Sequence, residues 1–214
     1  MTSLGKSTQN AALRLAILLL AAGEGSRLGR FPKALLKKNG NTLLNSFFTC
    51  AQDVAAIEMV VVTGYHAQVI EEAIELIRPM NFPIQVIRNS HPQEGQASSV
   101  RLGLEALKSD YDVLLVALSD QPNIASADIE ALLDQFNHRD ADEEIILPLV
   151  NGQRGNPVLF SKKAIGSILS LEGMVCRPYI DQHPALVKLY ETDNTAFILD
   201  VDTEADIQKL GLSR

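Results

Sequence analysis

The sequence predicts an α/β fold with a mostly parallel central sheet and helices on both faces of that sheet. Apolar runs rich in Val, Ile and Leu recur along the chain without alternating polar residues, and amphipathic segments separate these runs. Parallel strands that are covered on both faces have this pattern, whereas half-exposed strands alternate. The chain has 214 residues, of which 46% are hydrophobic, and this is enough for one domain with a sizeable core.

The first half of the chain alternates regularly between strands and helices. We expect strands at residues 14–20, 57–63, 84–88 and 112–118, and helices at residues 42–52, 67–78, 95–108 and 126–136. In the second of these helices the apolar residues recur at helical spacing, as Val69, Ile70, Ala73 and Ile74 show. Ser126 is the expected N-cap of the fourth helix.

The second half of the chain is less regular. Short apolar runs predict strands at residues 145–149, 157–160, 186–190 and 196–199, with helices at residues 162–169 and 203–210. Thr203, followed three residues later by Asp206, is close to a capping box at the start of the last helix. Residues 1–13 show no clear period and are expected to form a flexible tail, so residues 14–214 are expected to form a single domain.

Charge and cysteine content narrow the range of partners. A net charge of −7 and a pI near 5.1 argue against a nucleic-acid partner, because phosphate backbones are bound by clustered Lys and Arg. No segment approaches the roughly 20 apolar residues of a membrane span, so no membrane partner is expected. Cys50 and Cys176 lie far apart without metal-binding or disulfide spacing, which predicts reduced thiols and a cytoplasmic location.

The segment LAAGEGSRLGRFPK, residues 20–33, carries the strongest functional signal. A predicted strand ends there in a turn with Gly23, Gly25 and Gly29, whose spacing is one residue too long for the dinucleotide fingerprint. Residues 24–38 hold five cations, among them Arg27 and Lys33, and only one acid. Glycines let the backbone approach phosphates, and fixed cations neutralise phosphate charge. The alternative is a flexible surface loop, but the cations favour an anion-binding site.

Carboxylates follow two other predicted strands. Asp120 stands in the string ALSDQP, and Asp200 and Asp202 stand in FILDVDT. One or two carboxylates together with substrate phosphates are the usual ligands of Mg²⁺. Taken singly, Asp120 could be a turn residue and Asp202 a helix cap. Together with the glycine-rich loop they favour a Mg²⁺ site, although the spacing does not choose between Asp200 and Asp202 as the second ligand.

A second polar loop enters the predicted helix at residues 95–108. Gly95, Ser98 and Ser99 are placed to meet a nucleobase or ribose, with helix capping as the alternative for the two serines. Thr63 and Asn89 stand where two further strands end, and the carboxyl ends of parallel strands share one edge. We therefore expect all five residues in a nucleotide site. No G-x-S-x-G elbow or zinc spacing is present, which leaves phosphoryl chemistry driven by positioning and electrostatics.

Five strings occur in an order that resembles a known family: LAAGEGSRLG, the lysine in FPKALL, SDQP, GQRGNPVLF and DVDTEADI. They resemble the nucleotidyltransferases of the molybdenum-cofactor branch, particularly the molybdenum cofactor cytidylyltransferases, over about residues 16–210. The resemblance implies a Rossmann-like nucleotidyltransferase fold. It also implies a Mg²⁺-dependent transfer of CMP from CTP to the terminal phosphate of the molybdenum-pterin cofactor, with release of pyrophosphate.

The resemblance also assigns roles to individual residues of this chain. The base and ribose would be held by Leu20, Ala21, Ala22 and Gly23, the triphosphate by Gly25, Ser26 and the catalytic Arg27, and the α-phosphate by the catalytic Lys33. Asp120 would bind Mg²⁺ together with Asp200 or Asp202. The acceptor would meet Arg154, Gly155, Asn156 and Pro157, so the nucleotide part spans about residues 14–125 and the acceptor part about residues 126–214.

Two departures from the family pattern leave alternatives open. The guanylyl branch reads LAGG where this chain has LAAG, which favours CTP over GTP as the donor. Many relatives have a glycine–aspartate segment ending in G-A-R where this chain reads EGMVCR at residues 172–177, so the acceptor stays open. One alternative is an enzyme for another acceptor, such as a sugar or polyol phosphate. Another is a binding protein that makes transient contact with a molybdoenzyme and delivers a nucleotide cofactor to it.

Overall fold

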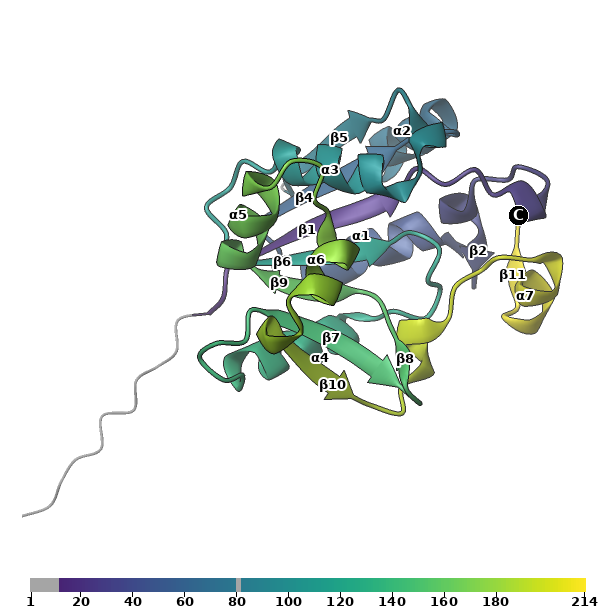
Figure 1. Cartoon of the computed structure of the whole chain (residues 1–214). Coiled ribbons are helices and arrows are strands. Elements are labelled where there is room, and N and C mark those ends of the chain that lie inside the picture. Colours follow the sequence, from purple (N-terminus) through teal and green to yellow (C-terminus); the bar gives the residue numbers. More distant parts are fainter. Residues whose placement is uncertain (1–11, 80–81) are drawn as a thin grey trace, which may run out of the picture.

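The computed structural model describes residues 12–79 and 82–214 (Figure 1), so the expected tail at residues 1–13 lies almost wholly outside the described residues. The strands of the main sheet are β1 (Leu15–Ala21), β4 (Glu58–Thr63), β5 (Ile84–Arg88), β6 (Val113–Leu118), β7 (Ile145–Val150), β8 (Gln153–Arg154), β9 (Val158–Ser161) and β10 (Val187–Glu191). Their order is β10-β7-β9-β6-β1-β4-β5, and β8 pairs with β7. Neighbouring strands are parallel, with two exceptions. Strand β9 runs antiparallel to β6 and β7, and β8 runs antiparallel to β7.

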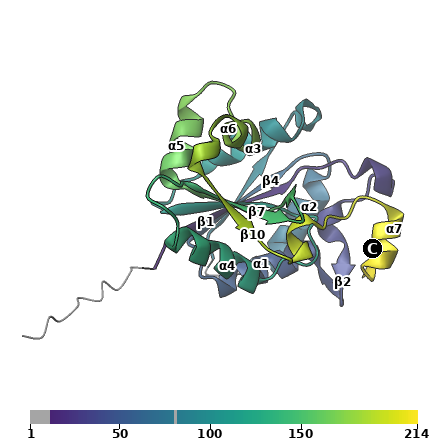
Figure 2. The same ribbon diagram turned by 60° about the horizontal axis from the view of Figure 1, so that its bottom comes forward.

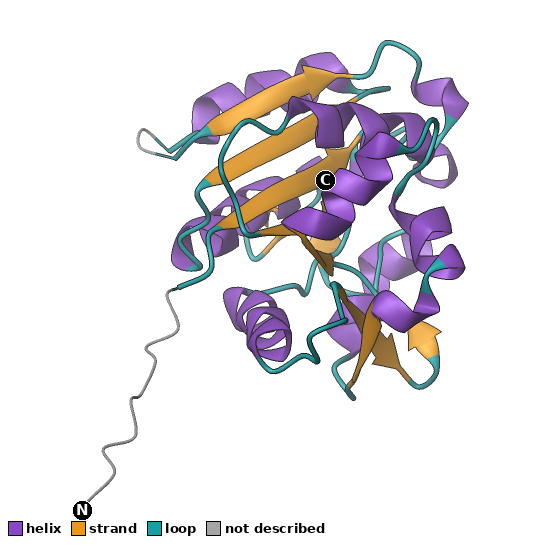
Figure 3. Cartoon of the chain, turned by 60° about the vertical axis from the view of Figure 1, so that its left-hand side comes forward, coloured by secondary structure: helices purple, strands orange, loops and turns teal. Residues whose placement is uncertain are grey.

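Helices cover both faces of this sheet, which confirms the predicted fold class (Figures 2 and 3). They are α1 (Leu43–Asp53), α2 (Ala67–Ile77), α3 (Gln96–Ala106), α4 (Ser126–Asn137), α5 (Lys162–Ser170), α6 (Cys176–Gln182) and α7 (Glu204–Lys209). The short 3-10 helices are η1 (Ser26–Leu28), η2 (Lys33–Leu35), η3 (Pro92–Glu94), η4 (Pro184–Leu186) and η5 (Thr195–Ile198). Among the described residues, no helix is both long enough and apolar enough to cross a bilayer.

The central strand β1 supplies both halves of the core because successive side chains point to opposite faces. Leu15, Ile17 and Leu19 pack in one cluster with buried residues of α1, α2 and α4. Ala16, Leu18 and Leu20 pack in the other with α3, α5 and α6. Helix α3 approaches the sheet closely at Gly103, where an added Cβ would lie 2.2 Å from a methyl carbon of Leu18. All seven residues of β1 are buried, which accounts for the absence of alternation in the sequence.

A small second sheet lies outside the main one. It is formed by β2 (Lys37–Lys38), β3 (Asn41–Thr42) and β11 (Leu212–Ser213), all antiparallel and each only two residues long. Figure 1 shows the C-terminal α7 and β11 beside β2. Leu28, Leu36 and Val201 belong to the buried cluster of this region. The segment that follows β1 is therefore held against the segment that contains Asp200 and Asp202.

Three sequence-based expectations differ from the structure. Residues 196–199 were expected to form a strand, but η5 occupies this segment, with Asn194 Oδ1 accepting from the N–H of Ala196. The apolar run there reflects the burial of Ala196 and Phe197 rather than a strand. Helix α6 was not expected, although Pro178 falls in its first turn, where a missing N–H costs no helical bond. The N-cap of α4 is Ala125 rather than Ser126, and the carboxylate of Asp128 accepts from the N–H of Ala125 at 2.8 Å.

Arg14 and Asp112, which directly precede β1 and β6, form an ion pair that joins the starts of the two strands. The guanidinium of Arg14 donates to both carboxylate oxygens of Asp112, at 2.7 and 3.1 Å, and the N–H of Arg14 donates to the same carboxylate at 2.9 Å. These bonds hold the pKa of Asp112 at about 2. The N–H of Asp112 donates in return to the carbonyl of Arg14. The pair thus fixes the register in which β1 and β6 begin.

We predict that Asp112→Asn destabilises the protein in a pH-dependent way. Because the folded-state pKa is depressed, the carboxylate contributes stability above its unfolded pKa of about 3.9, and this contribution is lost as the pH falls toward the folded value. Urea unfolding at a series of pH values should therefore show a deficit at pH 7 that shrinks below about pH 4. Asp193→Asn, at an exposed site outside any ion pair of the described residues, is the control. A deficit independent of pH would contradict this account.

Candidate active site

A cleft of about 510 Å³ opens at the carboxyl ends of β1 and β6. It contains most of the residues that the sequence placed in a nucleotide site. The lining residues include Leu20, Ala21, Ala22, Gly23, Gly25, Ser26, Lys33, Gly95, Ser99, Asp120 and Asp200. Tyr65, Pro92 and Gln96, which were not singled out as site residues from the sequence, complete the wall. Sheets of this kind bind ligands at this edge, so the cleft is where the fold class places a site.

The loop after β1 turns sharply at Gly25. This residue has φ +63°, and an added Cβ would lie only 2.3 Å from the carbonyl oxygen of Phe31. The carbonyl of Gly25 accepts from the N–H groups of Leu28 and Arg30, at 2.9 and 3.0 Å. Only glycine fits a left-handed turn with such close backbone contact. The turn brings the chain back over the end of β1 and places Lys33, at the start of η2, inside the cleft.

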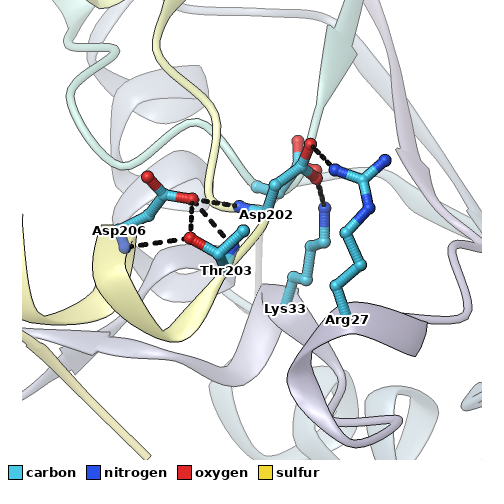
Figure 4. Close-up of polar contacts among 6 residues, drawn as sticks. Arg27, Lys33, Asp202, Thr203 and Asp206 are labelled. Atoms are coloured by element: carbon cyan, nitrogen blue, oxygen red, sulfur yellow. Dashed lines mark hydrogen bonds and ion pairs between the residues drawn. The ribbon is translucent and has the colours of Figure 1, made fainter.

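Lys33 is the centre of a cluster of charges. Its Nζ lies 3.0 Å from Oδ2 of Asp120 and 2.6 Å from Oδ1 of Asp202. The other oxygen of Asp202 accepts from the guanidinium of Arg27 at 2.8 Å. Figure 4 shows Arg27 and Lys33 converging on the carboxylate of Asp202. Four of the predicted catalytic and metal-binding residues therefore meet at one place.

The pKa values of this cluster follow from its contacts and its partial burial. Burial opposes the positive charge of Lys33, but the attraction of Asp120 and the hydrogen bonds to the two acids raise its pKa above the ordinary value. The hydrogen bond from Lys33 lowers the pKa of Asp202, and Arg27 adds to this effect. Burial raises the pKa of Asp200, as does repulsion from Asp120 and Asp202. Lys33 and Asp202 are thus held in their charged forms, whereas the charge of Asp200 is disfavoured.

A hydrogen-bonded turn holds Asp202 in position. The carboxylate of Asp206 accepts from the N–H groups of Asp202 and Thr203, at 3.1 and 2.7 Å (Figure 4). The hydroxyl of Thr203 in turn accepts from the N–H of Asp206, which completes the expected capping box of α7. The cap of α7 therefore also fixes the backbone of a residue in the charge cluster.

Carboxylate oxygens that could hold a divalent cation are available at Asp120 and Asp200. Oδ1 of Asp120 is buried and has no hydrogen-bond partner among the described residues. Within residues 12–79 and 82–214, no three His, Cys, Asp or Glu side chains form a complete metal cage. A cation here would take its remaining ligands from phosphates and water, as Mg²⁺ usually does. The donor set therefore fits a metal that arrives with a nucleotide.

Three predicted nucleotide-binding residues lie behind the cleft wall rather than in it. Thr63 is buried and donates its hydroxyl to Glu71 at 2.7 Å. Asn89 is also buried, and its amide donates to the hydroxyls of Ser98 and Ser99, both at 2.9 Å. Of Thr63, Asn89, Ser98 and Ser99, only Ser99 lines the cleft. Asn89 thus holds the start of α3, where Gly95 and Ser99 contribute to the lining of the cleft.

A second pocket of about 370 Å³ adjoins the first, and Leu20, Gln96 and Leu118 line both. Arg154, Gly155 and Asn156 line it as well, whereas Pro157 is buried and does not. This pocket also contains the exposed Arg177 and the buried Cys176, both in α6. Burial raises the pKa of the Cys176 thiol to about 12. Arg177 ends the string EGMVCR, in which the chain departs from many relatives. The apolar walls contributed by α6 were not foreseen because that helix was not predicted.

The sequence matches a nucleotidyltransferase family model and is also similar to a protein named an oxidoreductase. A family model described as the MobA-like NTP transferase domain matches residues 17–186. The nicotine blue oxidoreductase of Paenarthrobacter nicotinovorans is 31% identical over 202 residues, covering 90% of this chain and 94% of that protein.

Solved structures share the fold. Rv0371c from Mycobacterium tuberculosis H37Rv has a TM-score of 0.73 at 24% identity, covering 92% of this chain and 97% of that one. A second structure of that protein is a complex with manganese. The inositol-1-phosphate CTP transferase from T. maritima has a TM-score of 0.60 at 18% identity, covering 94% and 95%. Because the family model spans most of its length, the chain belongs to the MobA-like NTP transferase family and is a nucleotidyltransferase.

Proposed function

We propose that the protein uses a divalent metal to transfer CMP from CTP to a phosphate of the molybdenum-pterin cofactor, with release of pyrophosphate. The observation that carries this proposal is the meeting of Lys33, Arg27, Asp120 and Asp202 beside the glycine-rich loop. The motif resemblance supports the donor and the acceptor. The fold shared with a CTP transferase is consistent with the same donor.

The residues of the cleft act by binding and by charge stabilisation. Backbone N–H groups of the loop from Gly23 to Ser26 receive phosphate oxygens, and Arg27 neutralises part of the triphosphate charge. An oxygen of the acceptor phosphate attacks the α-phosphorus, the bond from that phosphorus to the bridging oxygen breaks, and pyrophosphate leaves with the bonding electrons. Lys33 stabilises the negative charge on the α-phosphate during this exchange.

Asp120 and Asp200 are the proposed metal ligands, and Asp202 is the partner of the cations. Both oxygens of Asp202 already accept from Lys33 or Arg27, whereas Asp120 has a buried oxygen with no hydrogen-bond partner among the described residues. A second carboxylate with a raised pKa, that of Asp200, lies nearby, and a cation relieves its repulsion from Asp120. When bound, Mg²⁺ or Mn²⁺ would neutralise phosphate charge and orient the triphosphate.

The second pocket is the proposed acceptor site. Because it shares walls with the nucleotide cleft, a ligand bound in it would lie next to the proposed position of the α-phosphate, as group transfer requires. Arg177 has no ion-pair partner in the described part of the chain and is available for an acidic group of the acceptor. Arg154 pairs with Asp181 at the same pocket. Asn156 also lines this pocket.

The test is to incubate the protein with Mg²⁺ or Mn²⁺, each nucleoside triphosphate in turn and molybdenum-loaded pterin, and to measure pyrophosphate. The proposal expects release that needs metal, acceptor and CTP together. Pyrophosphate release with a sugar or polyol phosphate, and none with the pterin, would show that the acceptor is the sugar or polyol phosphate and not the pterin. Nucleotide binding without any release would favour the delivery protein.

A second candidate function comes from the relative that is 31% identical and is named an oxidoreductase. The match covers 94% of that protein, so an activity of the whole relative is a candidate for this chain. Conversion of nicotine blue in the presence of a chemical reductant, followed by absorbance, separates the two functions. Turnover in this assay with no pyrophosphate release in the first would favour the oxidoreductase.

Asp120→Asn should reduce metal-dependent turnover by on the order of 100-fold or more, because it removes a charged ligand from the metal. The fold should persist, since Lys33 keeps its contact with Asp202. Steady-state pyrophosphate release and thermal unfolding measure the two effects. Asp193→Asn is the control. Wild-type turnover in the Asp120→Asn enzyme would refute the metal assignment.

Lys33→Ala should lower kcat by about 10²–10³-fold and change the affinity for CTP much less, since its charge acts mainly on the reacting phosphate. Lys37→Ala serves as the matched control, because Lys37 is exposed and lies in the same cationic segment. For each variant, kcat and the dissociation constant of CTP are measured, and the fold-change in each is compared with the wild type. Equal losses in the two quantities would make Lys33 a binding residue only.

Ala22→Gly should relax the choice of donor toward GTP. Ala22 lines the cleft, and its backbone carbonyl and methyl group also face Gly64. A methyl group at this position crowds a purine more than a pyrimidine. The ratio of kcat/KM for CTP to that for GTP, measured in wild type and variant, should fall by about tenfold, equivalent to about 1.4 kcal/mol. An unchanged ratio would assign donor choice to other residues.

A further inference from the structure

The side chain of Gln121, the residue after Asp120, joins two other loops of the site. It is only 8% exposed. Its Nε2 donates to the carbonyl of Asn156 and to the carbonyl of Phe197, both at 3.1 Å. Asn156 belongs to the loop that lines the second pocket, and Phe197 lies in η5, three residues before Asp200. One amide thus connects the three segments that carry the proposed metal ligands and the proposed acceptor contacts.

Backbone contacts make the position of this amide tight. The N–H of Asn156 donates to the carbonyl of Phe197 at 2.8 Å, and the N–H of Val201 donates to the carbonyl of Asp120 at 3.1 Å. An added Cβ on Gly155 would lie 2.8 Å from the carbonyl oxygen and from the Cβ of Phe197. The loops therefore touch directly around Gln121, and a shift of one is transmitted to the others.

The position of this side chain suits a donor with two N–H groups. Two carbonyl oxygens face the same point, and a glutamine amide offers two donors for them. A flipped amide would place Oε1 against both carbonyls, so the contacts fix its orientation. Oε1 itself is buried without a partner in the described part of the chain. Burying Oε1 without a partner costs free energy. The two hydrogen bonds of Nε2 offset this cost, so we attribute the structural role of Gln121 to them.

We propose that Gln121 is a positioning residue that sets the carboxylate of Asp120 relative to Asp200 and to the loop at Asn156. It touches no reacting atom. Its role rests on the proposed metal-dependent function, and it acts through the residues that hold the metal. Groups that orient metal ligands typically change metal affinity by about 10–100-fold when they are removed.

The test measures Mn²⁺ binding by electron paramagnetic resonance, in the presence of α,β-methylene-CTP, which cannot release pyrophosphate. Gln121→Met keeps the size of the side chain and removes both donors. We expect its Mn²⁺ affinity to fall by about tenfold or more, with the affinity for the nucleotide analogue in the absence of metal unchanged. Gln208→Met, at an exposed position on α7, is the matched control and should bind Mn²⁺ as the wild type does.

Three outcomes would overturn the proposal. They are an unchanged Mn²⁺ affinity in Gln121→Met, an equal loss of analogue affinity, and a loss matched by Gln208→Met. If Gln121→Met does not fold, the same measurement is made on Gln121→Asn. This variant keeps the amide but has a side chain that is one methylene shorter, so the amide no longer reaches both carbonyls. Wild-type Mn²⁺ affinity in Gln121→Asn would then refute the positioning role. Failure of the proposed metal site has a different signature, since the wild-type protein with the analogue would then bind no Mn²⁺. Failure of the proposed acceptor alone would appear only in the pyrophosphate assay and would leave Mn²⁺ binding unchanged.

Discussion

The ionic contacts of Lys33 with Asp120 and Asp202 are the constraint on which the rest of the site depends. They join residues that are 87 and 169 positions apart in the chain. The side chains of Lys33 and Asp120 are only 19% and 21% exposed, so each charge needs the other to offset its loss of water. Three loops from different strands are therefore held at fixed positions around one ammonium group. The tight turn at Gly25 and the capping box at Thr203 both serve this arrangement, because each positions one of the segments that supply the charges.

The same cluster explains how an acidic protein can receive a triphosphate. Its formal charges are three carboxylates, those of Asp120, Asp200 and Asp202, against the two cations Arg27 and Lys33. This excess of negative charge would repel phosphates unless another cation accompanies them. A divalent metal changes the sign of the balance. Burial raises the pKa of Asp200, and repulsion from Asp120 and Asp202 adds to this effect, so a bound cation would favour its charged form. The electrostatics of the chain alone therefore give a physical reason for the dependence on metal in the proposed function.

The sequence predicts the parts of the structure that are determined locally. Strands β1, β4, β5 and β6 lie within one or two residues of their expected bounds, because uninterrupted apolar runs leave little freedom. The segment 196–199 misled the prediction, since buried Phe197 contributes the same apolar signal from a 3-10 helix. Strand order places Thr63 and Asn89 near the cleft, but the direction of a side chain at a strand end depends on packing, and both side chains bond to neighbours behind the wall. The two bonds of Gln121 cross 35 and 76 positions, and no local pattern encodes them.

Strand direction explains why both halves of a transfer reaction can meet at one edge. The loop containing Asn156 precedes β9, and a loop that precedes a parallel strand would lie at the opposite edge of the sheet. Strand β9 runs antiparallel to β6, with Val158 paired to Val116 and Ser161 paired to Val113, so its first residue lies where β6 ends. Reversing this strand would move the loop by the length of four residues, roughly 13 Å. The reversal of β9, between β7 and β6, therefore brings Asn156 to the amide of Gln121, beside Asp120, and makes the second pocket continuous with the first.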